Sequence, residues 1–171
     1  MKKIEVINNF LKREEFMNLN SLLEDPYFPW FYNKDKDKKE KAYLITQFQF
    51  THAFFNGLDK SNYYNIILPL INAVNPKFLL RAKINLNPYS QKIVVGEFHT
   101  DNTIKQAMTA IYYINSNNGY TLIKTKNNIE RIESVGNRLV IFESSLLHAG
   151  TNSTDCKNRM VINLNYIKNE F

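Results

Sequence analysis

Two histidines and one aspartate in the second half of the chain, His99, Asp101 and His148, are residue types that bind transition metals. One residue separates His99 from Asp101, so on an extended strand both side chains project from the same side. The imidazole of His148, from a distant strand end, would complete a triangular set of ligands around one ion. Such a set leaves three positions open on an octahedral ion, so the pattern predicts a metal centre that can also bind other molecules.

Arg159 follows His148 by 11 residues and is the next feature with a chemical meaning. If residues 146–150 and 159–167 are adjacent antiparallel strands, Arg159 enters the same cavity as the metal. A buried guanidinium needs an anion, and it can pair in a bidentate way with the carboxylate at the far end of a small dicarboxylic ligand. A His-x-Asp motif alone is a weak signal, but the whole set arises by chance in roughly 1% of comparable chains.

The second half of the chain must supply the framework for these side chains, and its pattern is that of β-strands. From Lys77 onward, short segments rich in Ile, Val, Tyr and Phe are separated by turn sequences. Short connections with no helices between them favour an antiparallel sandwich or barrel. The expected strands are residues 78–86, 92–98, 108–115, 120–124, 128–134, 138–142 and 159–167.

The first half of the chain carries the helical signals. Apolar residues between positions 11 and 23 are spaced for one helical face, with Glu14 and Glu15 near its start. A second helix is expected over residues 61–74, where Asn75-Pro76 ends it.

Length and composition fit one globular domain over residues 1–171, with a helical support region (1–76) and a jelly-roll core (77–168). The chain has 171 residues, 44% of them hydrophobic, and a formal net charge of +6. The densest charged run, Lys34 to Lys41, also contains three acidic residues, so we interpret it as a solvated loop and do not expect a nucleic-acid partner. The single cysteine, Cys156, and the lack of a signal peptide or membrane-spanning run predict a soluble cytoplasmic protein with no membrane partner.

With its motifs in this order, the sequence resembles the prolyl-4-hydroxylase-like branch of the 2-oxoglutarate/Fe(II) oxygenase superfamily, especially its small members in bacteria and their viruses. The resemblance covers residues 78–168. It implies a double-stranded β-helix, or jelly roll, with N-terminal helices that support one sheet. The segments that carry it are His99-Thr100-Asp101, residues 111–115, residues 118–121, residues 138–142, Leu147-His148-Ala149-Gly150 and Arg159.

The resemblance implies roles for the three metal-binding residues and names the cofactors. His99, Asp101 and His148 match the ligands of a catalytic Fe(II). The implied reaction uses 2-oxoglutarate and O₂, hydroxylates a C–H bond, and produces succinate and CO₂. The iron would supply the difficult chemistry, and the protein would supply geometry and a closed pocket.

Four further residues match positions that hold the co-substrate in the family. Arg159 matches the residue that binds the distal carboxylate of 2-oxoglutarate, and Tyr113 matches a tyrosine whose hydroxyl helps to hold it. Tyr89, ten residues before His99, is similar to a co-substrate contact in some members, and Asn163 matches a polar position that lines the pocket.

The sequence also departs from the family pattern. Val161 stands where some relatives have serine, and residues 118–121 read Asn-Gly-Tyr-Thr in place of Gly-Gly-x-Thr. A second arginine near the C-terminus, as in relatives that demethylate nucleic acids, is absent, which argues against base repair.

We expect the substrate to be a peptide or protein, with a prolyl residue as one candidate, or a small molecule. Residues 28–41 and 102–107 are the loops expected to select it. Two alternatives stay open: a cupin-like metal-binding isomerase and a non-catalytic binding protein on the same architecture. Cupins commonly use more histidine ligands than the three histidines of this chain supply.

Overall fold

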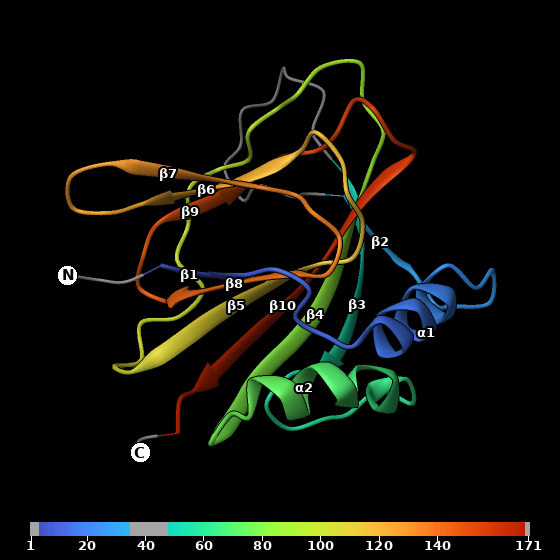
Figure 1. Ribbon diagram of the computed structural model, residues 1–171, viewed down its shortest axis with the longest axis horizontal. Helices are drawn as coiled ribbons and strands as arrows, with labels where there is room; N and C mark the ends of the chain where they lie inside the picture. The colour runs from blue at the N-terminus through green and yellow to red at the C-terminus, as the bar shows by residue number, and fades with distance from the viewer. Residues whose placement is uncertain (1–3, 35–47, 170–171) are drawn as a thin grey trace.

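A computed structural model describes residues 4–34 and 48–169 as two antiparallel β-sheets packed face to face, with helices against the outer face of the larger sheet (Figure 1). The smaller sheet has the order β7-β6-β9, formed by Ile129–Glu133, Tyr120–Lys124 and His148–Gly150. The larger sheet has the order β1-β8-β5-β10-β4-β3-β2. Its strands are Glu5–Ile7, Arg138–Glu143, Ala107–Tyr113, Asn158–Ile167, Phe78–Pro88, Gln49–Phe55 and Phe31–Asn33.

This arrangement is the expected jelly roll with supporting helices, so the predicted fold class is confirmed. All neighbouring strands pair antiparallel. The strands expected near residues 78–86, 108–115, 120–124, 128–134, 138–142 and 159–167 are present as β4, β5, β6, β7, β8 and β10.

The N-terminal half contains more strand than the sequence pattern predicts. Helix α1 (Arg13–Leu23) carries Glu14 and Glu15 in its first turn, as expected. The predicted helix over residues 61–74 is shorter and divided into a 3₁₀ turn, η1 (Tyr64–Ile67), and α2 (Leu68–Val74). Proline in the first turn of α2 starts a new helix well because its missing N–H has no helical partner there.

Strands β1, β2 and β3 were not predicted. Two of them have only three residues, too few for an alternating pattern to be recognised. The third, β3, holds the aromatic-rich sequence QFTHAFF and adds to the larger sheet beside β4.

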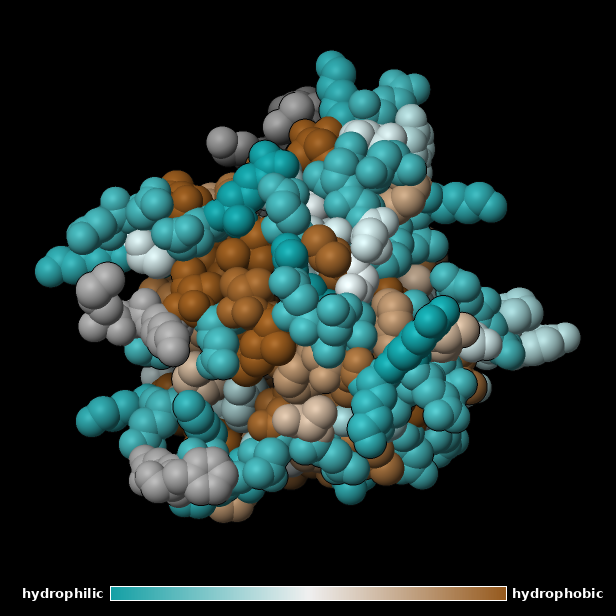
Figure 2. All heavy atoms as spheres, viewed as in Figure 1, coloured by the Kyte–Doolittle hydropathy of each residue, from teal (hydrophilic) through white to brown (hydrophobic). Residues whose placement is uncertain are grey.

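Two hydrophobic layers follow from the alternation of side chains along the strands of the larger sheet. On β5, Ala110 and Tyr112 face the helices, and Ile111 and Tyr113 face the smaller sheet. The outer layer joins this face to buried leucines of α1 and α2. The inner layer fills the space between the sheets, where Figure 2 shows hydrophobic side chains grouped between hydrophilic rims.

The strand predicted over residues 92–98 is wrong. The segment is not assigned to a strand. It meets the chain around β9 through two isolated bridges, Val95 with Thr151 and His99 with His148, and through single hydrogen bonds such as that from the Gly96 N–H to the Gly150 carbonyl. The register between these two bridges differs by one residue, so a continuous antiparallel ladder cannot connect them. The segment therefore runs alongside β9 as an irregular stretch.

The predicted adjacency of the His148 and Arg159 strands is also wrong. Strand β9, which begins at His148, pairs with β6 in the smaller sheet. Strand β10, which carries Arg159, pairs with β4 and β5 in the larger sheet. The two residues consequently line one cavity from opposite sheets.

Within residues 4–34 and 48–169, no helix has the length and apolar character needed to cross a membrane. Most of the charged run at Lys34 to Lys41, and with it part of the 28–41 loop, lies outside the described residues.

Candidate metal centre

Ligand atoms of His99, Asp101 and His148 all lie within 4.8 Å of one another. The Nε2 atom of His148 is 3.6 Å from Asp101 Oδ2, and the Nε2 atom of His99 is 3.9 Å from Asp101 Oδ1. The side chains of Asp101 and His148 are 4% and 3% exposed, whereas that of His99 is 56% exposed. The three groups thus surround a point that is buried on one side and open on the other.

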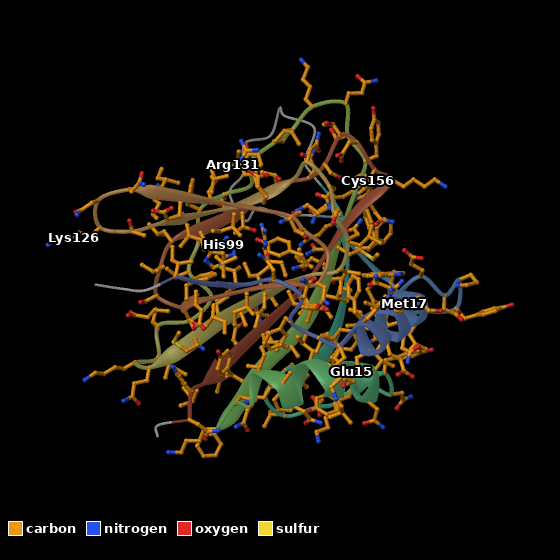
Figure 3. All side chains as sticks on the ribbon, viewed as in Figure 1. Glu15, Met17, His99, Lys126, Arg131 and Cys156 are labelled. Atoms are coloured by element: carbon orange, nitrogen blue, oxygen red, sulfur yellow. The ribbon has the colours of Figure 1, made fainter. Side chains whose placement is uncertain are left out.

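The backbone brings the two histidines together. His99 donates its N–H to the carbonyl of His148 at 3.0 Å, and His148 donates its N–H to the carbonyl of His99 at 2.9 Å. The imidazole centroids are 4.5 Å apart. In Figure 3, His99 lies between the two sheets, and Lys126 and Arg131 lie away from it on the β6–β7 hairpin. Asp101 lies two residues further along, at a bend of the chain, where its carboxylate approaches both imidazoles.

Each histidine presents the same nitrogen to the centre. The Nδ1 atom of His99 lies 3.0 Å from the carbonyl oxygen of Glu97, and that of His148 lies 3.1 Å from the carbonyl oxygen of Leu146. A carbonyl only accepts hydrogen bonds, so each Nδ1 carries the proton, and each Nε2 keeps its lone pair for an ion. Burial lowers the pKa of His148, although Asp101 opposes this effect, so His148 is neutral and can coordinate at neutral pH.

The carboxylate of Asp101 is held by three donors from three strands. It accepts hydrogen bonds from Arg81 of β4 at 2.9 Å, from Thr109 of β5 at 3.0 Å and from Asn165 of β10 at 3.0 Å. Burial raises the pKa of Asp101, but His148, Arg81 and Asn165 together outweigh burial and hold it below 3.8. The carboxylate is therefore ionised at neutral pH, as metal binding requires.

Asn165 connects these donors, because it also accepts from Arg81 Nε and donates to Thr109. Replacing Asn165 with alanine is expected to weaken Fe(II) binding by about 10- to 100-fold, the cost of losing a group that orients a ligand. Anaerobic metal titration measures the effect. Asn163→Ala is the matched control, since Asn163 lies on the same strand and has no hydrogen bond to Asp101. Equal metal affinity in the two variants would contradict this role.

Arg159 is 2% exposed and lies in the space between the sheets. It donates from Nε to Ser134 Oγ at 2.8 Å, from Nη1 to the Thr151 carbonyl at 3.3 Å and from Nη2 to Thr121 Oγ1 at 3.2 Å. All three partners are neutral, and among the described residues no carboxylate lies within 4.0 Å of the guanidinium. A fully buried cation in this position needs an anion.

One cavity of about 410 Å³ contains the metal ligands and Arg159. Its walls include β4, β5 and β10 of the larger sheet, the irregular segment from Gly96 to Asp101, and residues of the smaller sheet. The lining residues are Gln49, Arg81, Lys83, Asn85, Asn87, Gly96, Glu97, His99, Thr100, Asp101, Ile111, Thr121, His148, Gly150, Thr151, Arg159, Val161 and Asn163.

Gly119 is required by the position of Arg159. A Cβ atom at residue 119 would lie 2.6 Å from Arg159 Cδ and 2.5 Å from the Asn152 carbonyl oxygen. Gly119→Ala is expected to lower the free energy of unfolding by about 1–3 kcal/mol and to displace Arg159. Urea denaturation measures the first effect, and titration with 2-oxoglutarate measures the second. Gly136→Ala is the control, because its nearest neighbour is a ring atom of Phe16 at 3.3 Å. Equal stability of the two variants would contradict a requirement for glycine at position 119.

The other expected co-substrate residues differ in position. Tyr113 is fully buried, with its ring centroid 5.6 Å from the Arg159 guanidinium, and its hydroxyl donates to Thr121 Oγ1 at 2.8 Å. Asn163 lines the cavity. Tyr89 is 56% exposed and is not among the lining residues, because β4 ends at Pro88 and carries the chain past the cavity.

Sequence reasoning missed the polar side of β4. Arg81, Lys83, Asn85 and Asn87 alternate with apolar residues and line the cavity. Strict alternation was visible in the sequence, but it is equally typical of a strand whose polar face meets solvent. The same ambiguity hid Asn165.

No protein-family model matches this sequence, and no curated protein matches it either. Solved structures do share its fold. A prolyl hydroxylase from Trichoplax adhaerens, in complex with a hypoxia inducible factor peptide, has a TM-score of 0.68 at 16% identity over 98% of this chain and 84% of its own.

Two bacterial structures share the same fold. A Pseudomonas putida prolyl-4-hydroxylase has a TM-score of 0.70 at 13% identity over 99% of this chain and 94% of its own. An oxidoreductase of the 2OG-Fe(II) oxygenase family from Burkholderia pseudomallei has a TM-score of 0.72 at 10% identity over 98% of this chain and 86% of its own. The chain therefore has the fold of these oxygenases.

Proposed function

We propose that this protein is an Fe(II)- and 2-oxoglutarate-dependent dioxygenase that hydroxylates a C–H bond. The observation that carries the proposal is the occurrence, in one cavity, of a His-Asp-His set and a buried arginine without an acidic partner among the described residues. The metal ligands alone would suit several reactions. Arg159 adds a requirement for an anionic ligand that reaches across the space between the sheets.

The residues present fit an Fe(II) ion. His99 and His148 offer Nε2 lone pairs because their Nδ1 atoms face carbonyl oxygens, and Asp101 offers an ionised carboxylate. Three ligands on one side of the ion leave positions for the co-substrate and O₂. When bound together, Fe(II) and 2-oxoglutarate supply O₂ activation, with succinate and CO₂ as products and transfer of one oxygen atom to the substrate.

The protein contributes binding, orientation and exclusion of water. Arg159 binds the distal carboxylate of 2-oxoglutarate, and Thr121 and Thr151 fix the direction of its guanidinium. Tyr113 packs against that guanidinium from the core, and Asn163 offers a polar contact along the wall. Phe142 packs edge-on against His148, with ring centroids 5.0 Å apart, and closes the inner side of the metal centre.

The substrate is a peptide or protein, or a small molecule. One fold neighbour is described with a bound peptide, which makes a peptide one candidate here. We expect residues 102–107, which follow Asp101 in the chain, to contact it. We further propose that residues 1–171 form one domain that works in the cytoplasm, where the single thiol of Cys156 stays reduced.

The cupin-like alternative needs another histidine at the centre. His52 cannot supply it, because its Nδ1 lies 2.9 Å from the Pro29 carbonyl and its Nε2 lies 2.9 Å from Ser61 Oγ. It is buried among Phe28, Phe54 and Tyr63, next to the helices.

The test is anaerobic calorimetric titration with 2-oxoglutarate in the presence of Fe(II), followed by measurement of succinate formation after O₂ is admitted. The proposal expects saturable binding that depends on the metal, and succinate formation that depends on both Fe(II) and O₂. Failure of the Fe(II)-loaded protein to bind 2-oxoglutarate would overturn it.

A further inference from the structure

Lys83 of β4 is a cation in the cavity that the proposed function assigns neither to the metal nor to 2-oxoglutarate. Its side chain lines the cavity between those of Arg81 and Asn85, and its cross-strand neighbour on β10 is Asn163. Arg81 is engaged with Asp101, and Arg159 lies among Ser134, Thr121 and Thr151.

The ammonium of Lys83 has no acidic partner in the part of the chain that the structure describes. Among residues 4–34 and 48–169, no carboxylate lies within 4.0 Å of it. Burial lowers the pKa of Lys83, the nearby Arg81 lowers it further, and Asp101 raises it. A partly buried cation beside a second cation is unfavourable by itself, and an anion would relieve both effects.

Two amide groups next to Lys83 are also unsatisfied. The Oδ1 atoms of Asn85 and Asn163 are buried and have no hydrogen-bond partner among the described residues, and Asn85 as a whole is 8% exposed. Buried amide oxygens normally accept a hydrogen bond, so these two are suited to a ligand that brings donors. Lys83, Asn85 and Asn163 share one face of two paired strands, so a single small group can reach all three.

The net charge of the cavity also favours an anionic ligand. Among the described residues, its lining contains three cationic side chains (Arg81, Lys83 and Arg159) and two acidic ones (Glu97 and Asp101). Fe(II) would add two positive charges and 2-oxoglutarate would add two negative charges, so their contributions cancel. The described part of the lining would then keep one positive charge, which matches one anionic group on the substrate.

We propose that Lys83 binds an anionic group of the substrate, a carboxylate or a phosphate, and that neighbouring hydroxyl or amino groups of the substrate donate to Asn85 and Asn163. The substrate is thus a small molecule with a carboxylate or phosphate group, or a peptide residue that bears such a group. This inference rests on the proposed function, because it assigns the substrate end of the same cavity.

The experiment measures anion binding to the anaerobic Fe(II)–2-oxoglutarate complex by calorimetry. Acetate and inorganic phosphate are the probes, and acetamide is the neutral counterpart of acetate. Wild type is expected to bind acetate or phosphate saturably and acetamide at least ten-fold more weakly than acetate, and the stronger of the two anions identifies the group. Lys83→Met is expected to weaken anion binding at least ten-fold, and Lys83→Arg is expected to retain part of it.

Lys77→Met is the matched control, since Lys77 directly precedes β4 and is outside the cavity lining. It is expected to bind the anion within two-fold of wild type. Absence of saturable anion binding in wild type, or equal binding in Lys83→Met, overturns the inference. So does a Lys83→Met variant whose affinity for 2-oxoglutarate falls as far as its affinity for the anion, because Lys83 would then belong to the co-substrate. Failure of wild type to bind 2-oxoglutarate is a different result and counts against the proposed function.

Discussion

Replacing Arg159 with methionine is expected to weaken 2-oxoglutarate binding by at least about 100-fold and to leave Fe(II) affinity within about three-fold of wild type. Removing one partner of a buried, hydrogen-bonded charge pair costs roughly 2–5 kcal/mol, and about 2.7 kcal/mol corresponds to 100-fold in affinity. Arg159 is a group of this kind, because it is 2% exposed and its partners in the protein are neutral. Anaerobic titrations with 2-oxoglutarate and with Fe(II) measure the two affinities separately.

The variant is also expected to fold. Methionine fills much of the volume of the arginine stem, and it removes a buried charge whose desolvation is costly without a ligand. Arg131→Met is the control for loss of a positive charge, since Arg131 pairs with Glu133 on the exposed strand β7. If Arg159→Met and Arg131→Met bind 2-oxoglutarate equally well, Arg159 does not hold the co-substrate.

Asp101→Asn is expected to reduce Fe(II) affinity by more than about 100-fold, beyond the cost of losing a hydrogen bond that only supports a ligand. It should also reduce succinate formation below detection. Asparagine keeps the size of the side chain but lacks the charge that binds the ion. The carboxylate of Asp101 accepts hydrogen bonds from Arg81, Thr109 and Asn165. The amide NH₂ of an asparagine would face at least one of these donors and could not accept its hydrogen bond.

Metal titration and succinate formation are measured on this variant together with Asp155→Asn. Asp155 accepts from the backbone N–H of Asn118 in an exposed turn, so its replacement tests the general effect of an Asp-to-Asn change. A pure binding function would survive the loss of metal in Asp101→Asn. Normal Fe(II) affinity in that variant would remove Asp101 from the centre.

The residues that sequence reasoning located best were those with a distinctive type and a short spacing. His99 and Asp101 are two positions apart, and the structure brings their ligand atoms within 4.8 Å of each other even though the segment is irregular and bends at Asp101. His148 and Arg159 were placed in the same cavity for a wrong reason, since their strands belong to opposite sheets. Sequence spacing measures distance along the chain and contains no record of which sheet a strand joins.

The other differences between the predicted and the observed structure also have physical causes. An alternating strand such as β4 has one polar face, and only the packing of the smaller sheet above it turns that face into a cavity wall. The residues before His99 favour a strand, so the sequence predicts one there. In the structure the pairing register changes by one residue between the two bridges, so no continuous strand forms. Tyr89 was assigned to the cavity by its distance from His99 along the chain, yet its side chain is 56% exposed and its backbone pairs with Ser153.

The paired backbone hydrogen bonds between His99 and His148 have a kinetic consequence. Both imidazoles of the proposed metal centre belong to one isolated bridge, so opening of that bridge would separate them. An ion held by both imidazoles would stabilise the closed bridge, so local opening of the bridge would become rarer when the ion is bound. These two amide protons should therefore exchange with solvent more slowly in the ion-loaded protein than in the ion-free protein.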